Sequence, residues 1–441
     1  MTAAEALGAL RAIPGRPSLA ERRAALRGLE AVLLRRAEDI AVAAAADFGG
    51  RDRVETLLGD VLTVVQGARH ARRWLGWWAR PRRAGVPFPF WPARAWVEPV
   101  PKGVVGVMGP WNYPLQLCLW PAVDALAAGN RVVIKPSELA PRVALLLSDI
   151  LAEAPGPDFC RTILGGPEVA ADFAAQPWDH LVFTGGAAVG RRVMAAASDT
   201  LTPLTLELGG QCPAIVLPGA DLLRAAQAIL AGKTLNAGQT CVAPDTVLLI
   251  GHRAEDFAAA CRAAGPVSAT TALLGQGAAR VAALLDGAEA DALAAPAPGT
   301  QPIILARWPA GHPATMTEKF GPILGVEVLA DLAAAMAWLR ARPAPLSIAL
   351  FGPTRAEEAA IAAGVRAGAI TVGRCVDHVA WPGLGFGGAG GSGFGRYHGR
   401  AGFDTFSDLR ARVRHGPFAL ARMFDAPRGS RALALLERLL R

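Results

Sequence analysis

The chain of 441 residues contains few charged residues, 19% of the total, and very few lysines. Only Lys102, Lys135, Lys233 and Lys319 occur, and arginine supplies the rest of the basic residues behind the formal charge of +8. That imbalance indicates a coding bias toward arginine more than a surface built for nucleic acid. Because 52% of the residues are hydrophobic, the chain can bury large cores. We expect two domains, with disorder confined to short segments.

Cysteine pairs with metal-site spacing are also lacking. The six cysteines are scattered without a CxxC pair, and the seven histidines show no HExxH pattern; the cysteines stand at positions 118, 160, 212, 241, 261 and 375. We therefore expect reduced, mostly buried thiols and no metal site.

No apolar run is long enough to span a membrane, and the first residues lack the basic start and apolar stretch of a signal peptide. The sequence thus predicts a cytoplasmic protein without stable membrane insertion. The run 432–441 is apolar with a few charges. It is interpreted as a terminal helix packed on its partner, in preference to a weak contact with a membrane surface, because it is too short to span.

The densest basic cluster, Arg-Pro-Arg-Arg at 80–83, follows Trp74, Trp77 and Trp78. Basic residues among aromatics can bind nucleic acid. A solvated helix end whose tryptophans pack inward is the simpler interpretation, and we predict no nucleic-acid partner.

Strand and helix patterns alternate along the chain. Ser18 and Glu21 have the spacing of a capping box, and Leu26, Leu29 and Leu33 then share one helical face. A β-α-β-α-β succession over the first half predicts a parallel, doubly wound sheet, and a second alternating block begins after Gly210. The predicted strands are 104–108, 131–135, 180–184, 214–217 and 246–250. One predicted helix ends near 128 with a C-cap at Gly129, a second covers roughly 142–154, and a third begins at about 221. The stretch 285–302 is predicted to be a loop.

Cys241 lies in a small, polar, glycine-containing segment, 236–245, which follows Leu-Glu-Leu-Gly-Gly at 206–210 by a short interval. A thiol needs a nearby base to become a good nucleophile, and Glu207 is the obvious candidate. A cysteine in a loop is more often a bystander, so this pair alone does not establish catalysis.

Two strand ends suggest nucleotide binding. The strand ending at Thr184 runs into Gly185-Gly-Ala-Ala-Val-Gly190 and a helix, where unpaired N–H groups can meet a phosphate; a plain tight turn fits equally well. Lys135-Pro-Ser-Glu138 follows the neighbouring strand. The lysine can bond ribose hydroxyls, and Glu138 can accept from a 2′-hydroxyl while repelling a 2′-phosphate.

Several ordered motifs together resemble the aldehyde dehydrogenase superfamily. They are Pro110-Trp-Asn-Tyr-Pro114, Lys135-Pro-Ser-Glu138, Phe183-Thr-Gly-Gly186, Leu206-Glu-Leu-Gly-Gly210, Gly238-Gln-Thr-Cys241 and Glu318-Lys-Phe-Gly-Pro322. The segments 386–393, 396–399 and 403–407 are similar to the class 3 branch, which includes fatty, aromatic and coniferyl aldehyde dehydrogenases. The resemblance covers roughly residues 70–410.

This resemblance implies a mechanism. Cys241 attacks the aldehyde carbon, and the Asn112 side chain and the Cys241 backbone N–H stabilise the oxyanion. Hydride leaves to the nicotinamide, and Glu207 then activates the water that hydrolyses the thioester on Cys241. It implies NAD as cofactor, with NADP possible, and a hydrophobic aldehyde as substrate, aromatic or medium- to long-chain aliphatic.

The resemblance also implies the cofactor contacts. Lys135 and Glu138 take the adenosine ribose, and Gly185 and Gly190 flank the pyrophosphate. Glu318 holds the nicotinamide ribose, while Phe320 packs on the ring and Trp111 lies nearby.

The implied fold is α/β and aldehyde dehydrogenase-like: a Rossmann-type cofactor domain, an α/β catalytic domain and a small bridging β element, assembled as a homodimer. We assign 1–83 and 101–208 to the NAD(P)-binding domain and 209–394 to the catalytic domain, with return segments to the cofactor domain near its end. The bridging or oligomerisation element and C-terminal tail are assigned to 84–100 and 395–441.

Some positions depart from the family pattern. Gln211 stands where lysine is usual, Leu384-Gly-Phe386 replaces Leu-Pro-Phe, and Val372-Gly-Arg374 replaces Val-Asn ahead of His378. The Ala-rich segment 265–315 is shorter than expected, which suggests an altered surface loop. None of these changes removes a residue assigned to catalysis.

Three functions stay open at this point: a hydrolytic NAD(P)-dependent aldehyde dehydrogenase, a CoA-acylating relative, and an idle or nucleic-acid-binding protein of the same fold. The presence of Glu207 disfavours the second, and the set Cys241, Glu207 and Asn112 disfavours the third.

Overall fold

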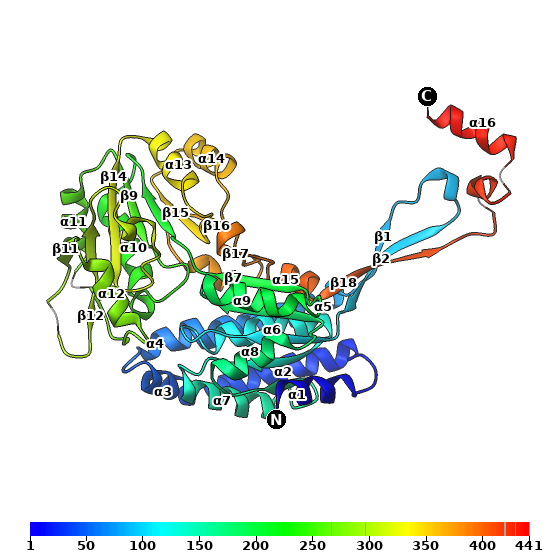
Figure 1. The fold of residues 1–441 in the computed structure, drawn as a ribbon, viewed down its shortest axis with the longest axis horizontal. Coiled ribbons are helices and arrows are strands. Elements are labelled where there is room, and N and C mark those ends of the chain that lie inside the picture. Colours follow the sequence, from blue (N-terminus) through cyan, green and yellow to red (C-terminus); the bar gives the residue numbers. More distant parts are fainter. Residues whose placement is uncertain (266, 296, 419, 428, 441) are drawn as a thin grey trace.

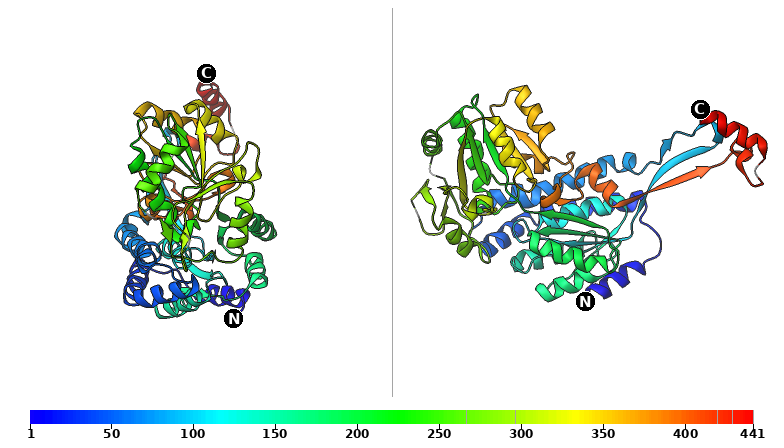
Figure 2. Two further views of the ribbon diagram at one scale, coloured as in Figure 1. Left: turned by 90° about the vertical axis from the view of Figure 1, so that its left-hand side faces the viewer. Right: turned by 45° about the horizontal axis from the view of Figure 1, so that its top comes forward.

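The protein was analysed as a computed structural model, which describes residues 1–265, 267–295, 297–418, 420–427 and 429–440. Its body consists of two α/β units, each built on a sheet, and a long arm projects away from them (Figures 1 and 2).

The first sheet contains the expected parallel strands. Its central strands are rich in Val, Ile and Leu and buried along their length, as in a sheet with both faces covered. Only β17, which returns from late in the chain, runs antiparallel. The order is β17(Gly393–Phe394), β7(Leu204–Leu208), β6(His180–Gly185), β3(Val104–Met108), β4(Arg131–Lys135), β5(Cys160–Thr162).

Helices cover this sheet on both faces. The predicted capping box is confirmed: Ser18 and Glu21 bond each other's backbone N–H groups, and Leu26, Leu29 and Leu33 are buried. The helices of this unit are α1(Ala3–Arg11), α2(Leu19–Arg35), α3(Ala37–Asp47), α4(Arg53–Thr56), α5(Thr63–Trp78), α6(Gln116–Ala128), α7(Pro141–Glu153), α8(Pro167–Ala175), α9(Ala187–Ser198) and α15(Gly399–Thr405), with a π-helical turn η1(Leu57–Leu62).

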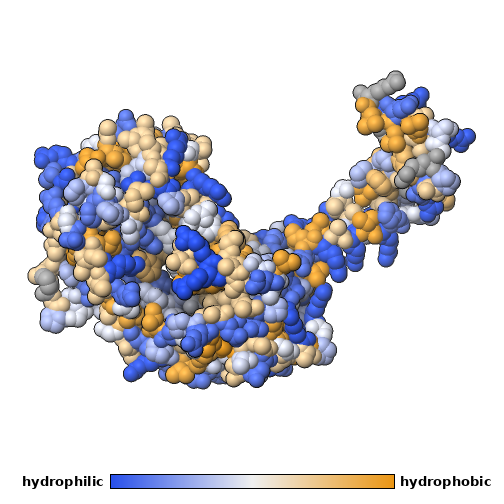
Figure 3. Space-filling view, in the orientation of Figure 1, coloured by the Kyte–Doolittle hydropathy of each residue, from blue (hydrophilic) through white to orange (hydrophobic). Residues whose placement is uncertain are grey.

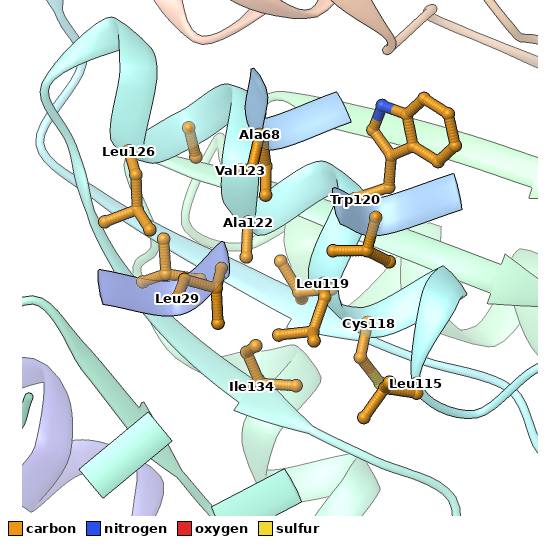
Figure 4. Packing of buried hydrophobic residues seen from close by; sticks show 14 of the residues in the cluster. Leu29, Ala68, Leu115, Cys118, Leu119, Trp120, Ala122, Val123, Leu126 and Ile134 are labelled. Atoms are coloured by element: carbon orange, nitrogen blue, oxygen red, sulfur yellow. The ribbon is translucent and has the colours of Figure 1, made fainter. Parts of the chain in front are cut away.

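The buried helix α6 lies at the centre of this unit. All of its residues are buried, which agrees with a sequence that is apolar around most of the helix. It packs between the sheet and helices α2 and α5, and Figure 4 shows its Leu119, Ala122 and Leu126 beside Leu29 and Ile134. As predicted, it ends at Gly129, which adopts the left-handed conformation.

The second unit is built on a seven-stranded sheet. The strands predicted at 214–217 and 246–250 appear there as β8 and β9, next to each other and parallel. The order is β11(Glu289–Ala292), β13(Ile304–Arg307), β14(Ile323–Leu329), β9(Thr246–Ile250), β8(Pro213–Val216), β15(Ser347–Phe351), β16(Ala369–Val372). Its helices are α10(Leu222–Thr234), α11(Ala254–Ala263), α12(Gly277–Leu285), α13(Leu332–Arg340) and α14(Arg355–Gly364), and a separate pair is β10(Ser268–Ala269) with β12(Gln301–Pro302).

The prediction of a loop at 285–302 was wrong in part, because β11 and β12 lie within it. Each is short and pairs with a strand on another segment, β13 or β10. Local composition rich in Ala, Pro and Gly does not signal such edge strands, because their stability comes from the partner strand.

The arm is a three-stranded antiparallel sheet, β1(Arg82–Ala84), β2(Arg94–Pro101) and β18(Ser407–Arg414). It carries the short turns η2(Phe88–Phe90) and η7(Leu420–Phe424) and the terminal helix α16(Ser430–Leu439) at its tip (Figure 1). The arm includes most of the segments assigned above to the bridging element, whose boundaries stay a prediction. Arg441, the last residue of the run 432–441, lies outside the described residues.

Apolar side chains are exposed on the arm and at its tip (Figure 3). The tryptophan prediction was also wrong in part: Trp78 is buried, but Trp74 and Trp77 are 42% and 59% exposed. Trp78 is buried because it faces α15, where its ring lies 5.7 Å from the ring of Phe403.

Candidate active site

One large cavity, about 630 Å³ in volume, is lined by residues of both units. Its walls include the carboxyl ends of β3, β4, β6 and β7, where ligands bind in open parallel sheets. The opposite wall comes from the second unit, which contributes Cys241 and the segment around Glu318. The cavity therefore exists only where the two units meet.

Nine of the ten residues singled out in the sequence line this cavity. They are Trp111, Asn112, Lys135, Glu138, Gly185, Glu207, Cys241, Glu318 and Phe320. Gly190 is the exception: it lies in the first turns of α9, and a Cβ there would stand 2.7 Å from Leu208 Cδ2. Its small size lets α9 approach the sheet, and it is not part of the cavity wall.

The loop that carries Cys241 is tightly turned. Asn236 and Ala237 have φ values of 51° and 53°, and Gly238 follows at 75°. A Cβ on Gly238 would stand 2.1 Å from the Gly321 carbonyl oxygen, so only glycine fits there. Left-handed non-glycine residues cost about 1–2 kcal/mol each, and tertiary contacts must hold them in place.

Hydrogen bonds from Asn236 supply part of that support. Its Nδ2 donates to the carbonyl oxygens of Asn112 (3.0 Å) and Gln239 (3.1 Å). The buried guanidinium of Arg51 donates to the same Asn112 oxygen at 3.1 Å and pairs with Asp60 at 3.2 Å. The turn before Cys241 is thus joined to the segment that carries Asn112.

The side chain of Asn112 is fixed by the same network. Its Nδ2 donates to the Gln239 carbonyl oxygen at 3.0 Å, and the carboxamide has a second N–H to offer. Because that side chain lines the cavity beside Cys241, the second N–H is available to an oxygen of a bound molecule.

Replacing Asn112 by alanine is expected to lower kcat about 100- to 1,000-fold, the usual effect of losing one oxyanion donor. KM should change little, because the charge on the oxyanion develops only in the transition state. Steady-state kinetics measure both, and thermal unfolding shows whether the variant is folded. A folded variant that loses less than about fivefold in kcat would contradict the oxyanion assignment.

Glu207 is buried, and its carboxylate oxygens bond no side chain in the described part of the protein. Burial raises its pKa well above the ordinary value, against the smaller opposing effects of the Arg396 charge and the Gly388 amide. A carboxyl group with a raised pKa is a stronger base once ionised, which suits proton abstraction from water near neutral pH.

The raised pKa of Glu207 has a consequence for stability. The folded chain holds this proton more tightly than the unfolded chain, so stability falls as pH rises from the unfolded pKa through the folded pKa. Glu207→Gln removes this loss. We therefore expect the variant to be more stable than the unchanged protein at pH 8, with the difference vanishing near pH 4, below the pKa of an exposed glutamate at about 4.3.

Urea unfolding across this pH range measures the effect, with the exposed Glu358→Gln as matched control. A constant difference at all pH values would mean that Glu207 ionises equally in both states.

The surroundings of the Cys241 thiol oppose its ionisation. Burial raises its pKa to about 12, and the charges of Glu318 and Glu207 add to that effect, while the N–H groups of Cys241 and Val242 oppose it. The thiol therefore needs a base within the cavity to become a nucleophile.

A nucleotide cofactor fits the first unit. The N-cap of α9 is Gly186, which provides no side-chain hydrogen bond, so the first N–H groups of a twelve-residue helix stay available. A Cβ on Gly186 would meet nothing within 4 Å, which leaves room for a phosphate. Nearby, Lys135 Nζ bonds Glu138 Oε2 at 2.7 Å, which lowers the pKa of that carboxyl group.

Glu318 and Phe320 come from the second unit. A Cβ on Gly209 would stand 2.3 Å from Glu318 Oε2, so any larger residue at position 209 would displace the Glu318 carboxylate. Burial raises the pKa of Glu318 to about 7, with a further contribution from the Asp245 charge. The Phe320 ring meets Trp111 edge-on at 5.9 Å and the Arg280 guanidinium at 5.3 Å.

The sequence analysis missed several residues of this site. Arg51, Asn236 and Gln239 fix the catalytic loop, and Leu274 to Gly277 with Arg280 line the cavity. These cavity residues belong to the segment 265–315, for which the sequence suggested an altered surface loop and gave no cavity role. Runs of small residues gave no signal of a cavity wall. The close spacing of Arg51, Glu55 and Asp60 in the sequence could have suggested their ion pairs.

Neither a metal site nor a membrane span is found in the described residues. No group of three or more His, Cys, Asp or Glu side chains is arranged to hold an ion. None of the described helices combines the length and apolar character needed to cross a membrane.

The fold is that of a two-unit α/β protein with a large cavity between the units. The family model described as "Aldehyde dehydrogenase family" matches residues 2–266 and 267–411. The chain belongs to the aldehyde dehydrogenase family and is an oxidoreductase of the kind that uses NAD or NADP.

Relatives place it in the class 3 branch. It is 38% identical to a probable coniferyl aldehyde dehydrogenase of Pseudomonas aeruginosa, over 96% of this chain and 92% of the relative. Identity to aldehyde dehydrogenase family 3 member A2 of Rattus norvegicus is 32%, over 87% of this chain and 82% of the relative. A solved structure of Staphylococcus aureus AldH in a substrate-bound state matches with a TM-score of 0.87 at 27% identity, covering 96% of this chain and 95% of that one. The predicted family and fold are confirmed.

Proposed function

We propose that this enzyme oxidises hydrophobic aldehydes, aromatic or medium- to long-chain aliphatic, to carboxylic acids. The observation that carries the proposal is the single cavity lined by Cys241, Glu207 and Asn112. A nucleophile, a base and an oxyanion donor in one cavity are what aldehyde oxidation through a thioester requires.

The first half of the reaction uses Cys241 and Asn112. Glu207 takes the thiol proton and releases it to solvent, which restores the carboxylate for the second half, and Cys241 Sγ attacks the aldehyde carbon. The Asn112 side chain and the Cys241 backbone N–H donate to the resulting oxyanion. Bound NAD supplies the acceptor for the hydride that leaves this carbon, and the product of the step is a thioester on Cys241.

The second half uses Glu207 on water. The carboxylate accepts a proton from water as the oxygen attacks the thioester carbonyl, and the C–S bond breaks to return the Cys241 thiolate and release the acid. Glu207 favours water over CoA as the acceptor, because water is a much weaker acid than a thiol and depends more strongly on a general base.

Support for a hydrophobic aldehyde comes from the cavity and from the relatives. Leu117, Leu346 and Phe386 line the cavity, and the first relatives act, by their names, on coniferyl aldehyde. We infer a preference for NAD, because Glu138 stands where a 2′-phosphate would add a second negative charge. Lys135 and Glu138 would hold the adenosine ribose, Gly185 the pyrophosphate, and Glu318 and Phe320 the nicotinamide end.

We also infer a cytoplasmic homodimer joined through the arm. The arm exposes Phe88, Trp91, Leu409 and Val413, and apolar side chains that are exposed together on a projecting sheet are typical of an interface.

The test follows nicotinamide reduction by absorbance with NAD and no CoA, over benzaldehyde, coniferaldehyde and aliphatic aldehydes of rising length. Turnover of coniferaldehyde and of the longer aldehydes without CoA is the expected result. Activity that depends strictly on CoA would instead identify an acylating enzyme, and preference for the shortest aldehydes would refute the hydrophobic substrate.

A further inference from the structure

Buried polar groups with few hydrogen-bond partners extend away from Glu207. Besides both oxygens of Glu207, they are Thr184 Oγ1, Tyr397 Oη and both ring nitrogens of His398 and of His378. Nearly all buried polar groups in folded proteins are hydrogen-bonded, to protein or to ordered water. Ordered water is the partner left to such groups. These five residues are called the polar chain below.

The first members lie together on the sheet. Thr184 and Glu207 are register partners on the parallel strands β6 and β7, so their side chains emerge from the same face. The Tyr397 phenol is fully buried, which raises its pKa, and the charges of Glu207 and Cys241 raise it further, while the Thr184 hydroxyl opposes the shift. Tyr397 therefore lies within electrostatic reach of both residues assigned to catalysis.

The later members lead from Tyr397 toward the surface. The rings of Tyr397 and His398 meet at 4.8 Å and nearly at right angles. His398 in turn stacks on Trp120 at 3.7 Å and on Phe386 at 5.4 Å, which clamps its faces and leaves its ring nitrogens at the edge. His378 lies 6.4 Å from the same Phe386 ring, and the residue is partly exposed although both of its ring nitrogens are buried.

The backbone holds these rings in position. Phe386 and Tyr397 exchange two backbone hydrogen bonds, of 2.7 and 2.9 Å. His398 has a φ of 77°, an unusual conformation for this residue, and its N–H donates to buried Asp124 Oδ2 at 2.7 Å. A strained residue persists where its surroundings over-determine it, and such residues cluster at functional sites.

We propose that the polar chain, together with bound water, carries the proton of the hydrolytic step from Glu207 to solvent. The proposal rests on the function proposed above. When water attacks the thioester, its O–H bond breaks and the proton passes to Glu207 as the C–O bond forms. That proton must leave before the next turnover, and the buried carboxylate has no contact of its own with solvent.

Each member suits the transfer. The hydroxyls of Thr184 and Tyr397 can accept one proton while donating another, and a neutral imidazole accepts at one nitrogen and donates at the other. Burial, together with the charge of His378, lowers the pKa of His398 well below its ordinary value, so it passes the proton on without storing it. The charged or titratable neighbours are Asp124, Arg396 and Cys241.

The experiment separates hydride transfer from thioester hydrolysis by rapid mixing with NAD and coniferaldehyde. Tyr397→Phe removes one oxygen and keeps the ring, and His398→Asn removes the relay nitrogen. Each variant is expected to keep the initial burst of NADH at its normal rate, close to one per site, while the steady rate after it falls about tenfold or more. Added imidazole buffer should restore much of the steady rate, which a purely structural defect would not allow.

His180→Asn is the matched control, because His180 is a buried histidine with an unpartnered Nδ1 at the opposite end of β6. It should change neither phase nor the buffer response. If Tyr397→Phe does not fold, Thr184→Val replaces it as the variant that deletes a hydroxyl.

Two results would overturn the proposal: a steady rate unchanged in both variants, or a burst slowed as much as the steady rate and unaffected by buffer. Failure of the proposed function has a different signature. Normal turnover of Glu207→Gln would show that Glu207 is not the general base, and this would contradict the proposed function whatever the polar-chain variants do.

Discussion

Replacing Cys241 by alanine is expected to abolish aldehyde oxidation, with a fall in kcat of about four orders of magnitude or more. The physical reason is that no other described thiol lines the cavity, so no thioester can form. The neighbouring Cys212 is buried behind the loop, and its Sγ donates to the Cys241 carbonyl oxygen at 3.1 Å. Absorbance of NADH with saturating NAD and coniferaldehyde measures the loss.

Cys261→Ala is the matched control, because this cysteine is buried on α11 and is not part of the cavity wall. It should leave kcat within about twofold of the unchanged enzyme, the scatter expected of a residue that touches no reacting group. An active Cys241→Ala variant would refute the thioester route, and an inactive control would mean that loss of activity reports general damage.

Glu207→Gln is expected to separate the two halves of the reaction. Amide nitrogen cannot accept the proton of water, so thioester hydrolysis should slow about 100- to 10,000-fold, the usual contribution of a general base. The first NADH per site should still appear, at a rate reduced by the loss of the base that ionises the thiol. Rapid mixing records the burst, and mass spectrometry of the stopped protein should show an acyl group on Cys241.

Glu358→Gln is the matched control, because Glu358 is exposed on α14 and is not part of the cavity wall, and it should leave both phases unchanged. Steady turnover of Glu207→Gln with no accumulated acyl enzyme would contradict the role of Glu207 in hydrolysis.

Local sequence patterns predicted much of the fold correctly. The capping box at Ser18, the C-cap at Gly129 and the strand at 246–250 are found as expected. Each of these signals depends on residues within a few positions of one another, so the chain needs no distant partner to encode it. The segment 285–302 failed for the opposite reason, because β11 and β12 are strands only through pairing with other segments.

The site divides in the same way. Ordered motifs identified Cys241, Glu207 and Asn112, and the structure brings them to one cavity. The groups that hold them were not predictable. Arg51 reaches Asn112 across 61 positions, and Asn236 reaches it across 124, so no local pattern indicates either bond.

The sequence by itself determined the elements, the family and the chemical groups of the site. Only the tertiary structure decided which of these groups are deprived of water and of partners. Burial raises the pKa values of Cys241 and Glu207 and leaves the polar chain with few protein partners. The packing of α5 also leaves Trp77 exposed, where an inward position was expected. Desolvation depends on everything packed around a side chain, and those neighbours come from segments far apart in the sequence.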